Sequence, residues 1–295
     1  MVGMLQPIFV AWVGVAFAQA PQPNNQLPAD LRDNAKLAAI VDAFSKGYGK
    51  EFGGVARNAK GETVLRLAGQ EFVYDDGKMK TYSELLDNPD IEDTFSHTYP
   101  ITNPTDKVPE NFSPGRFRVE DLFKALYGSN ETEVLRNCEL VYFCGHQVQF
   151  SARCGAADAL RAVGKDLDEL FAKEPYLKEY VAELGGTFQW RYIAGTKRLS
   201  NHSFGTAIDL NVKKSAYWRW EPLSSLSTFS RKDWPTDIIE AFERHGFIWG
   251  GKWWHYDTMH FEFRPELIAH SRANPSEPAP VPTDDQGKAN LSNTY

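Results

Sequence analysis

The sequence predicts a fold that mixes helices with short strands, because two kinds of periodicity alternate along the chain. Apolar residues recur at helical spacing in four segments, 30–48, 119–127, 156–171 and 237–245. Strand-like patterns occupy 63–67, 138–143, 147–152, 207–212 and 259–263. The two strands at 138–152 flank a Gly-containing turn, which predicts a hairpin.

Composition limits the size and the partners of the protein. The chain has 295 residues, of which 42% are hydrophobic and 24% charged, which fits one large or two small globular domains. Its net charge of -7 provides no positive field for phosphate backbones, so nucleic acid is excluded as an expected partner.

The first residues have the pattern of a secretory signal peptide. Met1–Ala20 contains no charged side chain, and an apolar run extends from Pro7 to Ala18. The small residues that end this run predict cleavage before Gln19, so that 1–18 is removed and the protein is exported to the periplasm or beyond. An uncleaved anchor is the alternative, although the run is short for a span of about 20 apolar residues. No stable membrane span is expected after cleavage.

The remaining chain divides by composition. A polar, proline-bearing linker at 19–29 precedes an N-terminal region, 30–134, whose role the sequence does not reveal. Region 135–272 carries the motifs described below, and 273–295 is rich in Pro, Ser, Asn and Asp, which predicts a disordered tail.

The cysteines are Cys138, Cys144 and Cys154. None belongs to a CxxC pair, so a thiolate zinc site is not expected. The predicted hairpin brings Cys138 close to Cys154, and a disulfide between them is compatible with an oxidising compartment. Three reduced, buried thiols are equally compatible with the sequence.

Two segments, 200–212 and 253–263, each end in a strict alternation of polar and apolar residues. Together they predict a metal site. If these strands are neighbours that share an apolar core, Asp209 and His260 lie on a common polar face. His202 lies seven residues before Asp209 and can fold back over the strand at Gly205. Two imidazoles and one carboxylate form a three-ligand Zn²⁺ set that leaves the fourth position open.

Asp257 is the expected general base of this site. It lies three residues before His260 in a loop that leads into the strand. Its carboxylate can therefore reach the open position while His260 binds the metal. Such a carboxylate can accept a proton from water and deliver it to a leaving amine.

The pattern SxHxxGxAxD at 200–209, followed by DxxHFE at 257–262, resembles the zinc D-Ala-D-Ala carboxypeptidase family, which includes VanY-type and VanX-type enzymes and phage endolysin peptidases. The resemblance extends over about 140–267. It implies an α+β fold in which a small antiparallel sheet bears the zinc site and helices flank it, as in the hedgehog signalling domain. It also implies His202, Asp209 and His260 as the metal ligands and Asp257 as the catalytic acid and base.

The family uses an arginine to polarise the scissile carbonyl, and the resemblance implies Arg191 for this role, with Arg198 as the alternative. VanX-type members carry Glu at the position of Asp257, so the shorter side chain suggests the VanY-like and endopeptidase branches. Candidate substrate-binding residues are Ser200, Arg198, His255 and Glu262, and Glu262 can also orient a ligand.

The resemblance implies a zinc peptidase that hydrolyses peptidoglycan stem peptides, either at the terminal D-Ala or between L-Ala and D-Glu. One rival is a noncatalytic, zinc-containing module that binds cell wall, as the hedgehog domain is a binding protein. Another is a glycosidase that uses Asp257 with Glu262, which requires a carboxylate pair about 5–9 Å apart.

Overall fold

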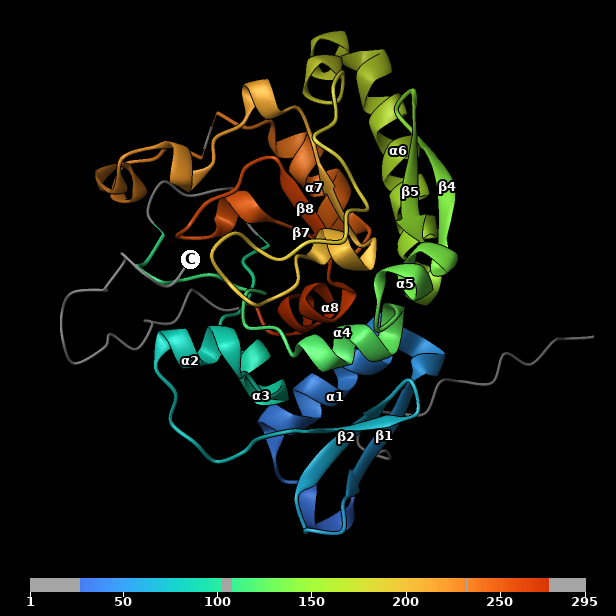
Figure 1. Ribbon diagram of the computed structural model, residues 1–295, viewed down its shortest axis with the longest axis vertical. Coiled ribbons are helices and arrows are strands. Elements are labelled where there is room, and N and C mark those ends of the chain that lie inside the picture. Colours follow the sequence, from blue (N-terminus) through green and yellow to red (C-terminus); the bar gives the residue numbers. More distant parts are fainter. Residues whose placement is uncertain (1–26, 102–107, 232, 276–295) are drawn as a thin grey trace, which may run out of the picture.

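Figure 1 shows the protein as a computed structural model, in which residues 27–101, 108–231 and 233–275 are described. Within these residues, no helix is long and apolar enough to cross a membrane. Outside them lie the predicted signal peptide 1–18 and most of two further predicted segments, the linker 19–29 and the tail 273–295.

The described residues form a mixed α and β structure with small antiparallel sheets, as expected for the α+β class. The helices are α1 (Ala35–Tyr48), α2 (Tyr82–Asp87), α3 (Ile91–Thr94), α4 (Glu120–Tyr127), α5 (Glu131–Asn137), α6 (Ala156–Lys173), α7 (Thr236–Arg244) and α8 (Pro265–Ala273). The strands are β1 (Phe52–Arg57), β2 (Thr63–Leu67), β3 (Gln70–Val73), β4 (Cys138–Phe143), β5 (His146–Ser151), β6 (Ala207–Asp209), β7 (Phe247–Trp249) and β8 (His260–Phe263).

The first long helix begins later than the apolar spacing predicts. Asn34 caps α1 by accepting a hydrogen bond of 2.9 Å from the backbone N–H of Leu37, so the helix starts at Ala35 and not near residue 30. Residues Ala29–Leu31 form a separate 3-10 turn. The helical spacing therefore locates the buried face of α1, and the cap sets its first residue.

The central sheet has the strand order β6-β8-β7, and all its pairs are antiparallel. In this register Asp209 lies opposite His260, and Ile208 lies opposite Phe261. The apolar residues share a buried core with α6 and α7. Because side chains alternate across a strand, this packing turns Asp209 and His260 toward the other face together.

The predicted hairpin is formed by β4 and β5, with Cys138 opposite Ser151. Cys138, Cys144 and Cys154 are free thiols, so of the two alternatives the structure shows the reduced one. Burial raises the pKa of the Cys138 thiol to about 11 and that of the Cys154 thiol to about 12.

The N-terminal region shares its core with the C-terminal helix. Helix α1 packs against α8, and Phe44 belongs to the same buried cluster as Leu267 and Ile268. The hydroxyl of Tyr48 on α1 donates a 2.8 Å hydrogen bond to Glu266 on α8. Region 30–134 is therefore joined by burial to the end of region 135–272.

We expect Phe44→Ala to destabilise the whole protein in one transition. Phe44 is 1% exposed and its ring contacts those of Tyr48, Phe52 and Phe95. Loss of this ring from a shared core costs about 3–5 kcal/mol of unfolding free energy. Urea denaturation followed by tryptophan fluorescence and by circular dichroism should show one shifted midpoint. Lys46→Ala, on the exposed side of α1, is the control, and two separate transitions would contradict a shared core.

Candidate metal centre

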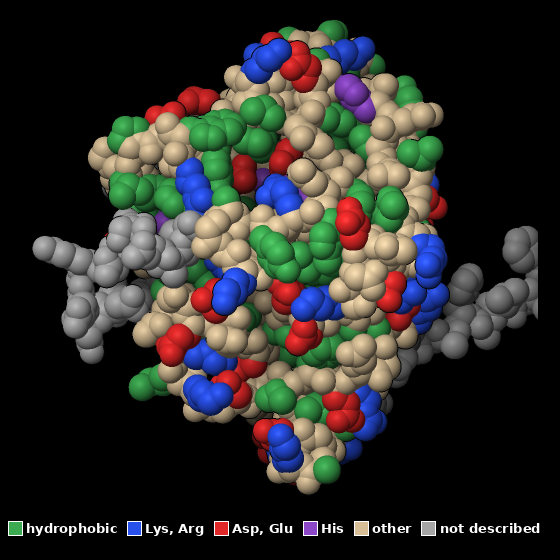
Figure 2. All heavy atoms as spheres, viewed as in Figure 1, with side chains coloured by type: hydrophobic (Ala, Val, Ile, Leu, Met, Phe, Trp, Pro, Cys, Tyr) green, Lys and Arg blue, Asp and Glu red, His purple; other side chains and the backbone are tan. Residues whose placement is uncertain are grey.

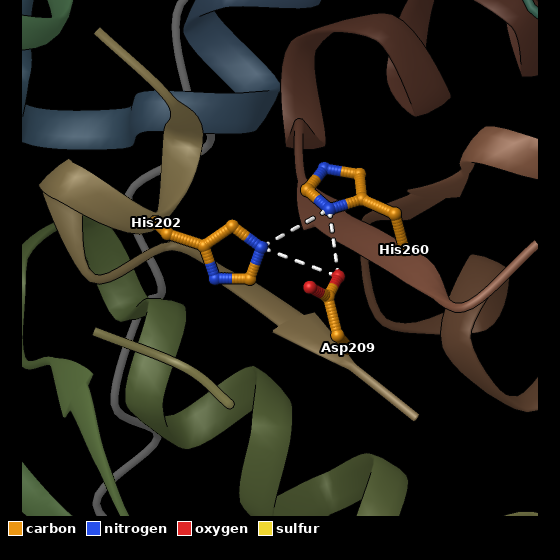
Figure 3. Close-up of side chains that lie close together, drawn as sticks. All are labelled: His202, Asp209 and His260. Carbon is orange, nitrogen blue, oxygen red and sulfur yellow. Dashed lines mark hydrogen bonds and ion pairs between the residues drawn. The ribbon is translucent and has the colours of Figure 1, made fainter. Parts of the chain in front are cut away.

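Three side chains converge on one point at the polar face of the central sheet. The closest atoms are His202 Nε2, Asp209 Oδ1 and His260 Nδ1 (Figure 3). The Nε2 atom of His202 lies 3.3 Å from His260 Nδ1 and 3.2 Å from Asp209 Oδ1, and His260 Nδ1 lies 3.0 Å from Asp209 Oδ1. These are the three residues that the sequence predicts as ligands, and the structure brings them together.

Strand pairing and a short turn place the three side chains. Asp209 and His260 face each other because β6 and β8 pair in that register. His202 lies in the 3-10 turn Asn201–Phe204, where the hydroxyl oxygen of Ser200 accepts a hydrogen bond from the backbone N–H of His202. Gly205 ends this turn with a φ of 65°, a left-handed conformation that favours glycine, and lets the chain reverse into β6. The predicted fold-back of His202 is therefore observed.

In each histidine, the outer ring nitrogen, which points away from Asp209, already has a hydrogen-bond partner. The inner nitrogen, which lies next to Asp209, is therefore left as an acceptor. His202 Nδ1 lies 2.6 Å from the carbonyl oxygen of Thr187, and His260 Nε2 lies 3.0 Å from Glu262 Oε2. Each outer nitrogen must carry a proton to donate to these oxygens. In the neutral rings, the two inner nitrogens then direct lone pairs toward the carboxylate of Asp209. Three converging acceptors require a cation among them.

The dimensions of this triangle fit Zn²⁺. A tetrahedral zinc ion bound at about 2.0–2.1 Å separates its ligand atoms by about 3.3 Å. The three observed separations, 3.0–3.3 Å, are close to this value. Donor chemistry agrees as well, since imidazole and carboxylate are ligands that zinc accepts. The arrangement is thus able to hold a divalent ion with one position left for water.

Charges at the site shift the pKa values in the way that a cation-binding cluster requires. Burial lowers the pKa of His260, but its bonds to Asp209 and Glu262 outweigh burial and raise that pKa to about 10. Burial raises the pKa of Asp209, but the two histidines outweigh it and hold that pKa far below its usual range. In the absence of a metal a proton is therefore held here, and metal binding has to release it.

A buried chain of polar contacts supports His260 from behind. Glu262 accepts from His260 Nε2 and also lies 3.2 Å from Arg264 Nη1. Arg264 Nε donates to Glu266 at 2.6 Å, and Glu266 accepts from Tyr48 of α1. Such outer contacts fix the orientation of a ligating ring. The N-terminal helix is thereby connected to the metal centre through a continuous series of contacts.

Asp257 is the second carboxylate of the site. Its backbone N–H donates to the carbonyl of Gly250 at 3.0 Å, which holds the loop before β8. Its Oδ1 atom is buried and has no hydrogen-bond partner among the described residues. Burial and the nearby charge of Asp209 raise its pKa to about 6. A carboxylate with this pKa exchanges protons near neutral pH, which suits a general base.

The two arginines predicted as alternatives differ in their surroundings. Arg191 is exposed, lines the cleft over the metal centre, and makes no ion pair with a described residue. Arg198 also lines the cleft, but its Nε atom lies 3.2 Å from Asp87 Oδ1. The ion pair restrains Arg198, so the geometry favours Arg191 as the group that can approach a substrate carbonyl.

Sequence reasoning missed two arginines that the N-terminal region contributes to the cleft, Arg116 and Arg118. Arg116 stacks over the ring of Trp253 at 4.4 Å and donates to the carbonyl of His255. Arg118 donates to Asn201 Oδ1 at 2.5 Å, directly before His202. In the sequence these two arginines are separated by one residue, which is the only local pattern they form. That pattern does not indicate that they lie near a motif more than eighty residues away.

The remaining substrate-binding candidates have different outcomes. Ser200 and Glu262 line the cleft, which has a volume of about 1080 Å³. His255 does not line it, because its ring is 1% exposed and packs against Trp218 at 4.6 Å. Figure 2 shows the hollow, with basic, acidic and histidine side chains inside it.

Residues 194–263 match a protein-family model described as D-alanyl-D-alanine carboxypeptidase. This stretch contains His202, Asp209, Asp257 and His260, and so covers both motifs and the central sheet. No curated protein and no solved structure matches the chain. The match supports a peptidase of this type, with a peptide as its substrate.

We expect Asp257→Asn to stabilise the metal-free protein at neutral pH. Because the folded pKa of Asp257 is raised from 3.8 to about 6, ionisation above pH 6 opposes folding by at most about 3 kcal/mol. Urea midpoints measured in chelator should favour the variant at pH 7.5. The difference should shrink as the pH falls through 6 and vanish below about 4. Asp158→Asn, at an exposed site on α6, should show no such pattern, and an equal pattern in both variants would refute this assignment.

Proposed function

We propose that this protein is a zinc-dependent peptidase that hydrolyses peptide bonds in peptidoglycan stem peptides. The observation that carries the proposal is the convergence of two imidazole nitrogens and one carboxylate oxygen beside a second, partnerless carboxylate. The first group is a cation site and the second is a base. Their combination in one cleft is what metal-assisted hydrolysis requires.

His202, Asp209 and His260 would hold the ion through His202 Nε2, Asp209 Oδ1 and His260 Nδ1. A bound Zn²⁺ supplies Lewis acidity, which polarises a carbonyl and lowers the pKa of water to about 7. Thr187 and Glu262 keep the two rings in the tautomers that direct a lone pair inward.

Asp257 accepts the proton of the attacking water and returns it to the departing amine. Its position suits both steps, because the buried Oδ1 atom has no hydrogen-bond partner among the described residues and is free to take up a proton and release it. Arg191 reaches from the cleft wall to the carbonyl oxygen, where negative charge develops. Neither role needs a serine or cysteine nucleophile.

The family match supports this substrate class, and two bonds of the stem peptide are candidates for cleavage. One is the terminal D-Ala-D-Ala bond, and the other is the bond between L-Ala and D-Glu. Such a substrate lies outside the cytoplasm, and the predicted signal peptide 1–18 is consistent with export to the periplasm or the cell exterior.

The two rival functions fit the geometry less well. A glycosidase would need both Asp257 and Glu262 free to reach a sugar, but Glu262 is buried and accepts hydrogen bonds from His260 and Arg264. A noncatalytic wall-binding module would have no use for a buried carboxylate without a partner. The unsatisfied Oδ1 of Asp257 therefore favours hydrolysis.

We expect purified protein to release D-Ala or stem fragments from peptidoglycan, and a chelator to abolish this release until Zn²⁺ is restored. Asp257→Asn should lower kcat by about 10²–10⁴-fold while zinc content stays unchanged, because the base is lost and the ligands remain. Chromatography of the soluble products and metal analysis provide the two measurements.

His202→Ala separates the metal from the base in the same experiment. This variant should lose zinc as well as activity, since one of the three ligands is missing. Hydrolysis that continues in chelator and in Asp257→Asn would rule out the proposed peptidase.

Arg191→Gln should lower kcat by about 10²–10³-fold and change KM much less, because its contact forms mainly in the transition state. Arg198→Gln is the matched comparison, since Arg198 lines the same cleft but is paired with Asp87. Steady-state kinetics on a soluble D-Ala-D-Ala peptide measure both. If Arg198→Gln lost more kcat than Arg191→Gln, Arg198 and not Arg191 would be the residue that contacts the carbonyl oxygen.

A further inference from the structure

We propose that Arg116 binds a carboxylate on the residue that leaves the peptide, and so determines which bonds are cut. The inference rests on the proposed peptidase function and concerns the substrate that this site selects. Arg116 belongs to the N-terminal region and lies outside the residues that match the family model.

The position of Arg116 is fixed next to the metal centre. Its guanidinium lies 4.4 Å from the ring of Trp253, and the Trp253 ring lies 5.6 Å from that of His260. Gly115 before it has a φ of 90°, and a Cβ there would come within 2.6 Å of Ile248. The backbone is therefore held tightly at this point, and the charge of Arg116 acts directly on the pKa of Asp257.

The guanidinium has donors that the protein does not use. Its Nη2 atom donates to the carbonyl of His255 at 3.2 Å, and its buried Nε has no partner among the described residues. Arg116 forms no ion pair with an acidic side chain of the described chain. A guanidinium has five N–H donors in a planar fork that matches a carboxylate. A cation whose hydrogen-bonded and stacked partners are neutral is suited to an anionic ligand.

The other arginines of the cleft either have partners within the protein or are assigned to another part of the substrate. Arg198 is paired with Asp87, and Arg118 donates to Asn201 and to the carbonyl of Leu199. Arg191 is assigned above to the reacting carbonyl. Arg116 therefore remains for a second charge on the substrate.

Both candidate bonds place a carboxylate on the leaving residue. A terminal D-Ala carries the C-terminal carboxylate of the chain. A D-Glu joined through one carboxyl group keeps the other one free, whichever of the two is linked. The two candidate substrates therefore have one feature in common, a free carboxylate on the residue whose amine is the leaving group. An uncharged residue there would leave Arg116 unpaired inside the cleft, which is costly when water is displaced.

Four soluble peptides test the inference and distinguish the two sources. One pair ends in D-Ala-D-Ala with either a free carboxylate or an amide, and the other contains L-Ala-D-Glu linked onward through one carboxyl group, with its second carboxyl group either free or converted to an amide. We expect the zinc-loaded wild type to cleave the charged member of one pair at least ten times more efficiently than the neutral member. The pair in which this occurs identifies the carboxylate.

For that peptide, Arg116→Gln should raise KM by about 10–100-fold, as expected for a lost charged hydrogen bond, while kcat changes by less than threefold. Neutral peptides should be cleaved equally by the variant and the wild type. Arg116→Lys keeps the positive charge but lacks the planar guanidinium group, so its KM should lie between the KM values of the wild type and Arg116→Gln. Lys197→Gln removes another cation of the cleft, at an exposed position, and should leave KM unchanged. Zinc content and thermal unfolding of each variant confirm that it is folded.

Equal loss of kcat on charged and neutral peptides would overturn the inference and assign Arg116 to the reacting carbonyl. Unchanged KM in Arg116→Gln would also overturn it and would leave the peptidase proposal intact. If the zinc-loaded wild type cleaves none of the four peptides and releases nothing from peptidoglycan, the proposed function fails, and the role of Arg116 fails with it.

Discussion

The convergence of three metal-ligand atoms on one point is the constraint on which the site depends. The ligand atoms of His202, Asp209 and His260 lie within 3.3 Å of one another, so a proton or a metal ion must be shared among them. The antiparallel register of β6 and β8, the glycine-terminated turn before β6 and the apolar core under the sheet all hold these atoms in place. The folded protein therefore keeps the three ligands together around a proton before any ion binds, and a metal ion has to displace that proton.

The N-terminal region takes part in the same site. A buried series of contacts runs from His260 through Glu262, Arg264 and Glu266 to Tyr48 of α1. If α1 moved away from α8, the charged groups of this series would lose hydrogen-bond partners. They would then be either exposed to water or buried without a partner, which is destabilising. The same region also lines the cleft with arginines. The proposed hydrolysis thus takes place in the part that matches the family model, and the proposed selection of the substrate depends on the part before it.

Local pattern predicts the ligand set because it depends on short-range geometry. Alternation places Asp209 and His260 on polar faces, and a glycine permits His202 to return over the strand. The start of α1 and the burial of His255 were not predicted, because a cap and a packed tryptophan override apolar spacing and polarity. Arg116 carries no motif of its own, so its place in the cleft could not be read from its neighbours in sequence.

The sequence by itself determined which side chains can bind a metal and which carboxylate can serve as a base, since these follow from residue type and periodicity. Only the tertiary structure decided which ring nitrogens face inward, which carboxylate lacks a partner and which arginine keeps unused donors. The physical reason is that these properties depend on what each polar atom meets after burial. Contacts such as Tyr48 with Glu266, or Arg116 with Trp253, form between segments far apart in the chain.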